Sequence, residues 1–113
     1  MSNKPLLFIA SFTMNEGLSS EFQEFMEKDH FPKMHKTGCF TGKTQKFLDT
    51  ASKPGTHSMT YIHFVKSEEK WSEYNQKKEF RPVLKKEFWD KYGAMIECNG
   101  IVSIQTVSFP TEV

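Results

Sequence analysis

Three residues combine side chains suited to proton transfer with a spacing that directs them to one space: His30, Tyr61 and His63. Tyr61 and His63 are two residues apart in an apolar segment, so on a β-strand their side chains share one face. His30 lies four residues after Met26 and four before Met34, so on a helix it continues an apolar stripe. Because imidazole titrates near neutral pH, a histidine in a pocket can act as an acid, a base or a hydrogen-bond donor. We therefore take these three as candidate catalytic residues.

Each candidate also has a structural interpretation, which the sequence leaves open. His30 would then hydrogen-bond a backbone carbonyl and fix a kink before Pro32, which has no amide N–H to donate. Tyr61 and His63, joined by Glu97 from the last strand, would form a polar network at a dimer interface, where buried polar groups satisfy one another. With a ligand present, the same histidine, tyrosine and carboxylate would instead make a proton-transfer site.

The histidine spacing does not predict a metal site. His30 and His35 are five residues apart rather than the four that place two ligands on one helix face. His57 and His63 share a strand face, but their separation of six residues puts them roughly 20 Å apart. The sequence contains no P-loop, dinucleotide-binding fingerprint or nucleophile-elbow motif. We predict no metal and no cofactor; haem stays open as an alternative, because one histidine can serve as its axial ligand.

Composition narrows the class of protein further. The chain has 113 residues, and we expect a single domain over 1–113. Its 15 basic and 14 acidic residues give a net charge of +1 and are evenly spread, which argues against nucleic-acid binding. No apolar stretch approaches the roughly 20 residues needed to cross a bilayer, and the run Leu6–Phe12 is too short for a signal-peptide core. Cys39 and Cys98 form no CxxC motif, so we expect a cytoplasmic protein with free thiols.

Alternation and helical periodicity predict six elements in the order strand, helix, strand, strand, helix, strand. The predicted strands are Pro5–Thr13, Cys39–Leu48 at a polar sheet edge, His57–Val65, and Ala94–Phe109 with a bend at Asn99–Gly100. The first helix carries an apolar stripe of Leu18, Phe22, Phe25 and Met26, and the second begins after Ser67 and is interrupted at Pro82.

This order predicts an α+β fold of the ferredoxin-like type, an antiparallel β-α-β-β-α-β sheet with both helices on one face. The helices cover only one face, yet the second face is apolar too. In the first strand Leu6, Phe8 and Phe12 lie opposite Leu7 and Ile9, and the third strand puts Met59, Tyr61 and Val65 behind Ile62 and Phe64. An antiparallel sheet with one face in water alternates more cleanly between apolar and polar residues. The simplest cover for this face is the same face of a second copy, so we expect a homodimer.

The most distinctive segment runs from Phe22 to Phe40 and contains the spacings His30-x-Pro32 and Thr37-Gly38-x-Phe40. It resembles the bacterial family known as domain of unknown function 4286. The likeness continues through the Tyr61 strand, the Arg81-Pro82 break and the segment Phe88–Gly93. It differs in the aromatic pair Phe22 and Phe25, where the family often has Trp. The resemblance implies a dimeric α+β barrel, two ferredoxin-like sheets packed face to face, but it implies no reaction and supplies no catalytic residues.

Together these inferences give one expectation and one alternative. The expected protein is a dimeric α+β barrel that binds or transforms a small hydrophobic metabolite in a cavity between sheet and helices, lined by His30, Tyr61 and His63. We attribute these polar groups to the mainly apolar second face of the sheet. The alternative is a noncatalytic dimerisation or partner-binding module, which the lack of a recognisable catalytic motif favours.

Overall fold

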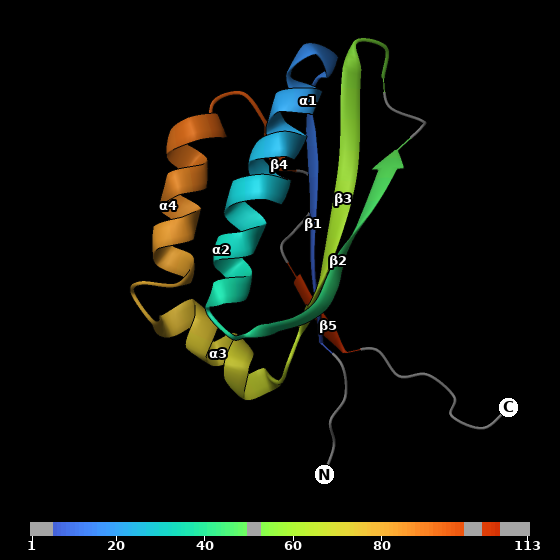
Figure 1. Ribbon diagram of the computed structural model, residues 1–113. Helices are drawn as coiled ribbons and strands as arrows, with labels where there is room; N and C mark the ends of the chain where they lie inside the picture. Colours follow the sequence, from blue (N-terminus) through green and yellow to red (C-terminus); the bar gives the residue numbers. More distant parts are fainter. Residues whose placement is uncertain (1–5, 50–52, 99–102, 107–113) are drawn as a thin grey trace, which may run out of the picture.

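The computed structural model describes residues 6–49, 53–98 and 103–106. It forms two layers, a sheet and a set of helices that all lie on one of its faces (Figure 1). The elements in chain order are β1 (Leu6–Asn15), α1 (Glu16–Phe25), the π-helical turn η1 (Met26–His30), α2 (Phe31–Lys36), β2 (Phe40–Asp49), β3 (Thr56–Val65), α3 (Glu68–Gln76), α4 (Arg81–Tyr92), β4 (Glu97–Cys98) and β5 (Ser103–Thr106).

The sheet has the predicted antiparallel, ferredoxin-like arrangement. Its strands follow the order β2-β3-β1-β4, and β5 also pairs with β1. The central pair runs in unbroken register from Leu6 opposite Val65 to Asn15 opposite Thr56. The predicted last strand starts later than expected, at Glu97 rather than at Ala94, and its described parts are β4 and β5, which both pair with β1. The predicted bend at Asn99–Gly100 lies outside the described residues.

The first predicted helix is a continuous stretch that changes its hydrogen-bond pattern before a proline. Pro32 has no amide N–H, so an uninterrupted α-helix would leave the carbonyl of Lys28 without its usual partner. The chain instead forms η1, in which the N–H of Phe31 donates to the carbonyl of Met26, five residues back. A single π turn of this kind inserts into a helix without ending it, and such turns are frequent at functional sites. His30 is its last residue.

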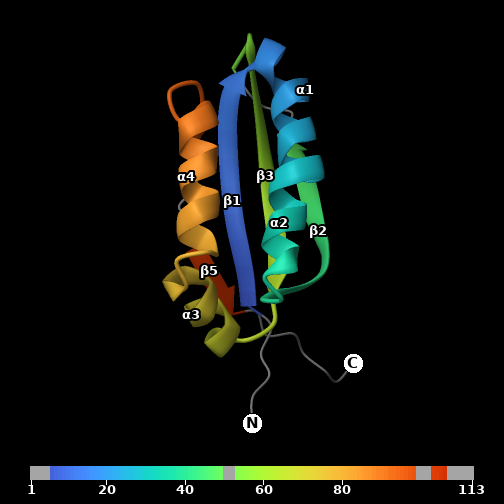
Figure 2. The same cartoon turned by 60° about the vertical axis from the view of Figure 1, so that its left-hand side comes forward.

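The second predicted helix is divided as expected. Ser67 caps α3, because its side chain accepts a hydrogen bond from the N–H of Lys70 at 3.1 Å. Pro82 lies in the first turn of α4, where a missing N–H costs nothing. Figures 1 and 2 agree that α4 and the α1–α2 stretch lie side by side on the same face of the sheet, with β1 behind the space between them.

The two faces of the sheet differ in chemistry. The face under the helices is buried and carries, from β1 and β3, Leu6, Phe8, Ala10, Phe12, Met14, Met59, Tyr61, His63 and Val65. The prediction that Tyr61 and His63 belong to the second face is therefore wrong. Strand alternation puts them with Met59 and Val65, and the helices cover that set.

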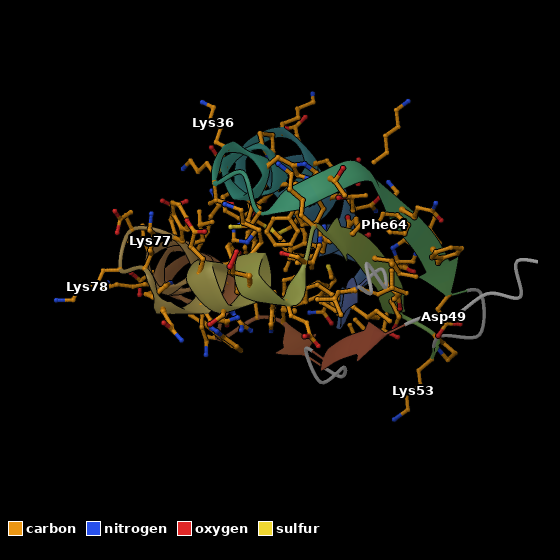
Figure 3. All side chains as sticks on the ribbon, turned by 90° about the horizontal axis from the view of Figure 1, so that it is seen from below. Lys36, Asp49, Lys53, Phe64, Lys77 and Lys78 are labelled. Atoms are coloured by element: carbon orange, nitrogen blue, oxygen red, sulfur yellow. The ribbon has the colours of Figure 1, made fainter. Side chains whose placement is uncertain are left out.

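The opposite face is divided into an apolar half and a hydroxyl half. Leu7 pairs with Phe64 and Ile9 with Ile62 in the apolar half, and all four are partly buried. Figure 3, seen from below, shows Phe64 on the side of the sheet away from the helices. In the other half the hydroxyls hydrogen-bond across the strands at 2.7 Å, in the pairs Ser11–Thr60 and Thr13–Ser58. The recurrence of apolar groups on this face is thus confirmed for half of its length.

Within the part of the chain that the structure describes, no helix is long and apolar enough to span a membrane.

Candidate functional site

A cavity of about 240 Å³ lies between the sheet and the helices. Its floor comes from β1 and β3, one wall from η1 and α2, and the other wall from α3 and α4. Exposed Lys85 and Trp89 mark the side that opens to solvent. The lining residues are Phe8, Ala10, Phe12, Met26, His30, Phe31, Met34, His63, Tyr74, Arg81, Leu84, Lys85, Phe88 and Trp89. A mainly apolar concavity with few polar groups is the usual form of a small-molecule site.

His30 brings an unpartnered polar atom to this cavity. Its side chain is buried, and Nδ1 has no hydrogen-bond partner among the described residues. The ring lies among aromatic neighbours, with centroids about 6 Å from those of Phe25, Phe31 and Phe88. Burial lowers the pKa of His30 from 6.5 to about 4, although the Glu87 and Asp29 carboxylates raise it in part. At neutral pH the imidazole is therefore uncharged.

His63 is also buried in the cavity wall, and one of its nitrogens is already occupied. Its Nδ1 lies 2.8 Å from Thr44 Oγ1, and the same hydroxyl lies 3.5 Å from His35 Nε2. The ring packs against Phe31, with centroids 4.6 Å apart. Burial, together with the smaller effects of nearby His35 and His30, lowers its pKa from 6.5 to about 3. Because Nδ1 is bonded to Thr44, Nε2 is the nitrogen left for a ligand.

A bulge in β2 places Thr44 beside His63. Thr41 pairs with Phe64 and Gln45 with Ile62, so the three residues 42–44 lie opposite His63 alone. Gly42 has φ +72°, a left-handed conformation that glycine adopts without strain. Bulges of this kind redirect side chains at sheet edges. Here the bulge turns the Thr44 hydroxyl toward the helix-covered face.

Tyr61 is separated from the cavity and lines a second, more open groove of about 550 Å³. Phe31 borders both spaces and lies between them. The Tyr61 hydroxyl donates to Glu27 Oε2 at 3.1 Å, and Lys46 Nζ lies 2.8 Å from the same oxygen. Burial is the larger cause that raises the pKa of Tyr61, and the negative charge of Glu27 beside the hydroxyl raises it as well. The tyrosine is therefore protonated and is held as a donor to a carboxylate.

The structure thus brings together two of the three predicted residues. His30 and His63 line one cavity, while Tyr61 belongs to the groove beside it. The carboxylate near Tyr61 is Glu27, which the sequence interpretation missed, and the side chain proposed to join it, Glu97, lies outside the described side chains. Glu27 is three residues before His30, but it falls on the polar side of the helical pattern, so periodicity gave no signal for it.

Thr44 and Arg81 were also missed as site residues. Thr44 lies in a polar edge strand and reaches His63 only through the bulge. Arg81 was noted as part of a helix break, yet it lines the cavity, and its guanidinium carbon lies 5.5 Å from the Phe8 ring centroid. No cluster of three histidine, cysteine or carboxylate side chains is placed to hold a metal ion in residues 6–49, 53–98 and 103–106.

Comparison of the fold with solved structures finds small α+β proteins of similar length. An ethyl tert-butyl ether (EthD) family protein from Bacillus halodurans has a TM-score of 0.61 at 11% identity, over 91% of this chain and 99% of that chain. SnoaB, a cofactor-independent oxygenase from Streptomyces nogalater, has a TM-score of 0.62 at 11% identity, over 97% and 99%. A candidate antibiotic biosynthesis monooxygenase from Bacillus cereus has a TM-score of 0.55 at 14% identity, over 97% and 99%. At these identities the likeness shows the fold alone, that of dimeric α+β barrel proteins.

Comparison of the sequence gives a family. Among curated proteins none matches the chain. The family model described as a domain of unknown function, DUF4286, matches residues 6–99, a range that includes the His30-x-Pro32 and Thr37-Gly38-x-Phe40 spacings. The resemblance drawn from those spacings is confirmed, and the chain belongs to the DUF4286 family.

Proposed function

We propose that the cavity between sheet and helices binds a small hydrophobic molecule that hydrogen-bonds to His30. The observation that carries this proposal is the buried Nδ1 of His30, which lines an apolar cavity and has no partner among the described residues. Buried polar atoms in folded proteins are nearly always hydrogen-bonded, and leaving one unpaired costs about 1–3 kcal/mol. A ligand with a donor or acceptor at this position would recover that cost.

The dimensions of the cavity suggest the size of the ligand. An apolar cavity of about 150 Å³ accommodates benzene. The present cavity of about 240 Å³ is roughly half as large again, which suits a bicyclic aromatic body. The cavity lining includes four phenyl rings that can pack against such a ligand, those of Phe8, Phe12, Phe31 and Phe88.

The chemistry available in this cavity is proton transfer. Burial keeps both imidazoles uncharged at neutral pH. In the tautomers that leave His30 Nδ1 and His63 Nε2 without a hydrogen, each nitrogen can accept a hydrogen bond from a ligand group, and a proton from a group acidic enough to match its lowered pKa. SnoaB and the Bacillus cereus protein carry names of oxygenases. A shared fold is a weak guide to chemistry, so for this chain the proposal rests on the two histidines.

A pair of matched ligands tests the role of His30. We expect 2-naphthol to bind three- to tenfold more tightly than naphthalene in calorimetric titrations, because one neutral hydrogen bond contributes about 0.5–1.5 kcal/mol. In His30→Leu both compounds should bind equally well. Tyr61→Phe, which alters the neighbouring groove, should keep the preference for naphthol. A preference that survives in His30→Leu, or no binding of either compound, would contradict the proposal.

We propose further that the protein is a homodimer in which the open faces of two sheets pack together. The apolar half of that face, formed by Leu7, Ile9, Ile62 and Phe64, supports this arrangement, as does the likeness to dimeric α+β barrel proteins. Exposed apolar patches of this kind mark interaction surfaces. The alternative, a module that binds another partner, is supported by Phe47 and Leu48. These two apolar side chains are about half exposed on the edge strand β2.

Substitution of Ile62 by Glu tests the dimer. We expect Ile62→Glu to sediment as a monomer at concentrations at which the unaltered protein is a dimer, because each subunit would bury an unpaired carboxylate in the apolar interface. Val83→Glu, an equal change of charge on the helical side of the molecule, should leave the dimer intact. A wild-type protein that sediments as a monomer would exclude the proposed assembly and favour a surface for another partner.

A further inference from the structure

Two cationic side chains from α4 border the cavity described above. Arg81 and Lys85 both line it, one turn apart on the helix, and Lys85 is exposed at the side open to solvent. The guanidinium carbon of Arg81 lies 5.5 Å from the ring centroid of Phe8 and 5.3 Å from that of Trp71. Since Phe8 lines the cavity, the charge of Arg81 lies against its apolar wall rather than in open solvent.

Neither cation has a carboxylate partner in the described part of the chain. Arg81 uses one N–H to donate to Asn75 Oδ1, a neutral acceptor, and a guanidinium has five N–H groups. Lys85 makes no ion pair or hydrogen bond with the described residues. Glu87 is the carboxylate with the largest electrostatic effect on His30. It is already paired with Lys33, at 2.9 Å.

Neighbouring lysines of the helical layer are engaged, in contrast to Lys85. Lys86 pairs with Asp90 at 2.7 Å one turn further along α4, and Lys91 lies over the ring of Phe25. Arg81 and Lys85 are therefore the cations of α4 that line the cavity and lack a carboxylate partner among the described residues. Cations beside a low-dielectric wall attract an anion more strongly than cations surrounded by water.

We propose that the natural ligand is an aromatic or otherwise apolar acid, whose ring system fills the cavity and whose carboxylate lies at Arg81 and Lys85. This inference rests on the proposed function, since it adds a charged end to the same hydrophobic ligand. The ligand would place its apolar body among the Phe rings and one polar group near His30. Its carboxylate would accept hydrogen bonds from the guanidinium and the ammonium, which are stronger than those between neutral groups.

The test compares 2-naphthoate with 2-naphthamide, which has nearly the same shape and no charge. We expect naphthoate to bind about tenfold more tightly, the margin that separates charge-assisted from neutral hydrogen bonds. Arg81→Gln should remove most of this preference. Because Arg81 also stacks on Trp71, a second variant is needed: Lys85→Gln, at an exposed position, should lower naphthoate affinity about threefold and leave naphthamide affinity unchanged.

Lys86→Gln is the matched control, since it removes the same charge one residue away from the cavity lining. It should change neither affinity. Equal binding of naphthoate and naphthamide by the wild type would overturn the anionic ligand and leave the hydrophobic cavity site standing. An equal loss in Lys86→Gln and Lys85→Gln would also overturn it, because it would indicate a diffuse field rather than a site. If neither compound binds and 2-naphthol does not bind either, the proposed function falls with the inference.

Discussion

Lowering the pH from 7 to 5 is expected to lower the free energy of unfolding by about 4 kcal/mol, chiefly through His30 and His63. In the unfolded chain each imidazole takes up a proton near pH 6.5, whereas in the folded protein burial lowers the pKa to about 4 for His30 and about 3 for His63. Between these values the unfolded state binds more protons than the folded state. This contribution to stability is therefore present above pH 6.5 and is lost as the pH falls through 6.5 toward the folded-state values of about 4 for His30 and about 3 for His63.

Urea unfolding at pH 7, 6 and 5 measures this dependence. Replacing one imidazole, in His30→Leu or His63→Asn, should reduce the slope of stability against pH by about half, because each buried histidine contributes up to 1.4 kcal/mol per pH unit. Tyr61→Phe is the control, since burial raises the pKa of Tyr61 and keeps it protonated throughout this range. If both single histidine variants keep the full slope of unfolding free energy against pH, other titrating groups cause the loss of stability in acid.

The overall fold could be predicted because its signals are local. Alternation in β1 and β3 identified both strands and the residues that share a face, and Ser67 and Pro82 marked where the second helical region starts and breaks. The choice of the buried face was harder. Leu7, Ile9, Ile62 and Phe64 are as apolar as the residues opposite them, so composition alone did not show which set the helices cover. That choice depends on the handedness of the crossover connections.

The candidate site was predictable only in part, because its geometry depends on contacts between distant segments. Helical periodicity correctly placed His30 on the buried stripe. Strand alternation correctly placed His63 on one face with Tyr61, but it did not show that the helices cover this face. Periodicity gave no way to see that Phe31 separates Tyr61 from them, since that depends on the π turn preceding Pro32. Thr44 reaches His63 through an irregularity in an edge strand, and a pattern of period two carries no signal for such a bulge.

Phe22→Ala is expected to lower the free energy of unfolding by about 3–5 kcal/mol, the usual cost of deleting a fully buried phenyl ring. Phe22 has no exposed surface, and its ring contacts three others, with centroid distances of 5.2 Å to Phe12, 5.4 Å to Tyr92 and 6.1 Å to Phe88. These contacts join α1 to β1 and to α4. The cavity left by the substitution would lie where the sheet and both helical stretches meet, so no single element can relax to fill it.

Phe25→Ala in the same helix and Phe47→Ala in β2 are graded controls for this result. Because Phe25 is partly buried, Phe25→Ala should lower the free energy of unfolding by less than Phe22→Ala does. Phe47 is 52% exposed, so Phe47→Ala should change the free energy of unfolding by less than about 0.5 kcal/mol. Thermal and urea unfolding at pH 7 give the three values, and at this pH the buried histidines are uncharged. Similar losses for Phe22 and Phe25 would contradict the role of Phe22. The ring that joins the two layers would then be Phe88, which contacts Phe12 and also lines the cavity, so its loss should weaken ligand binding as well as stability.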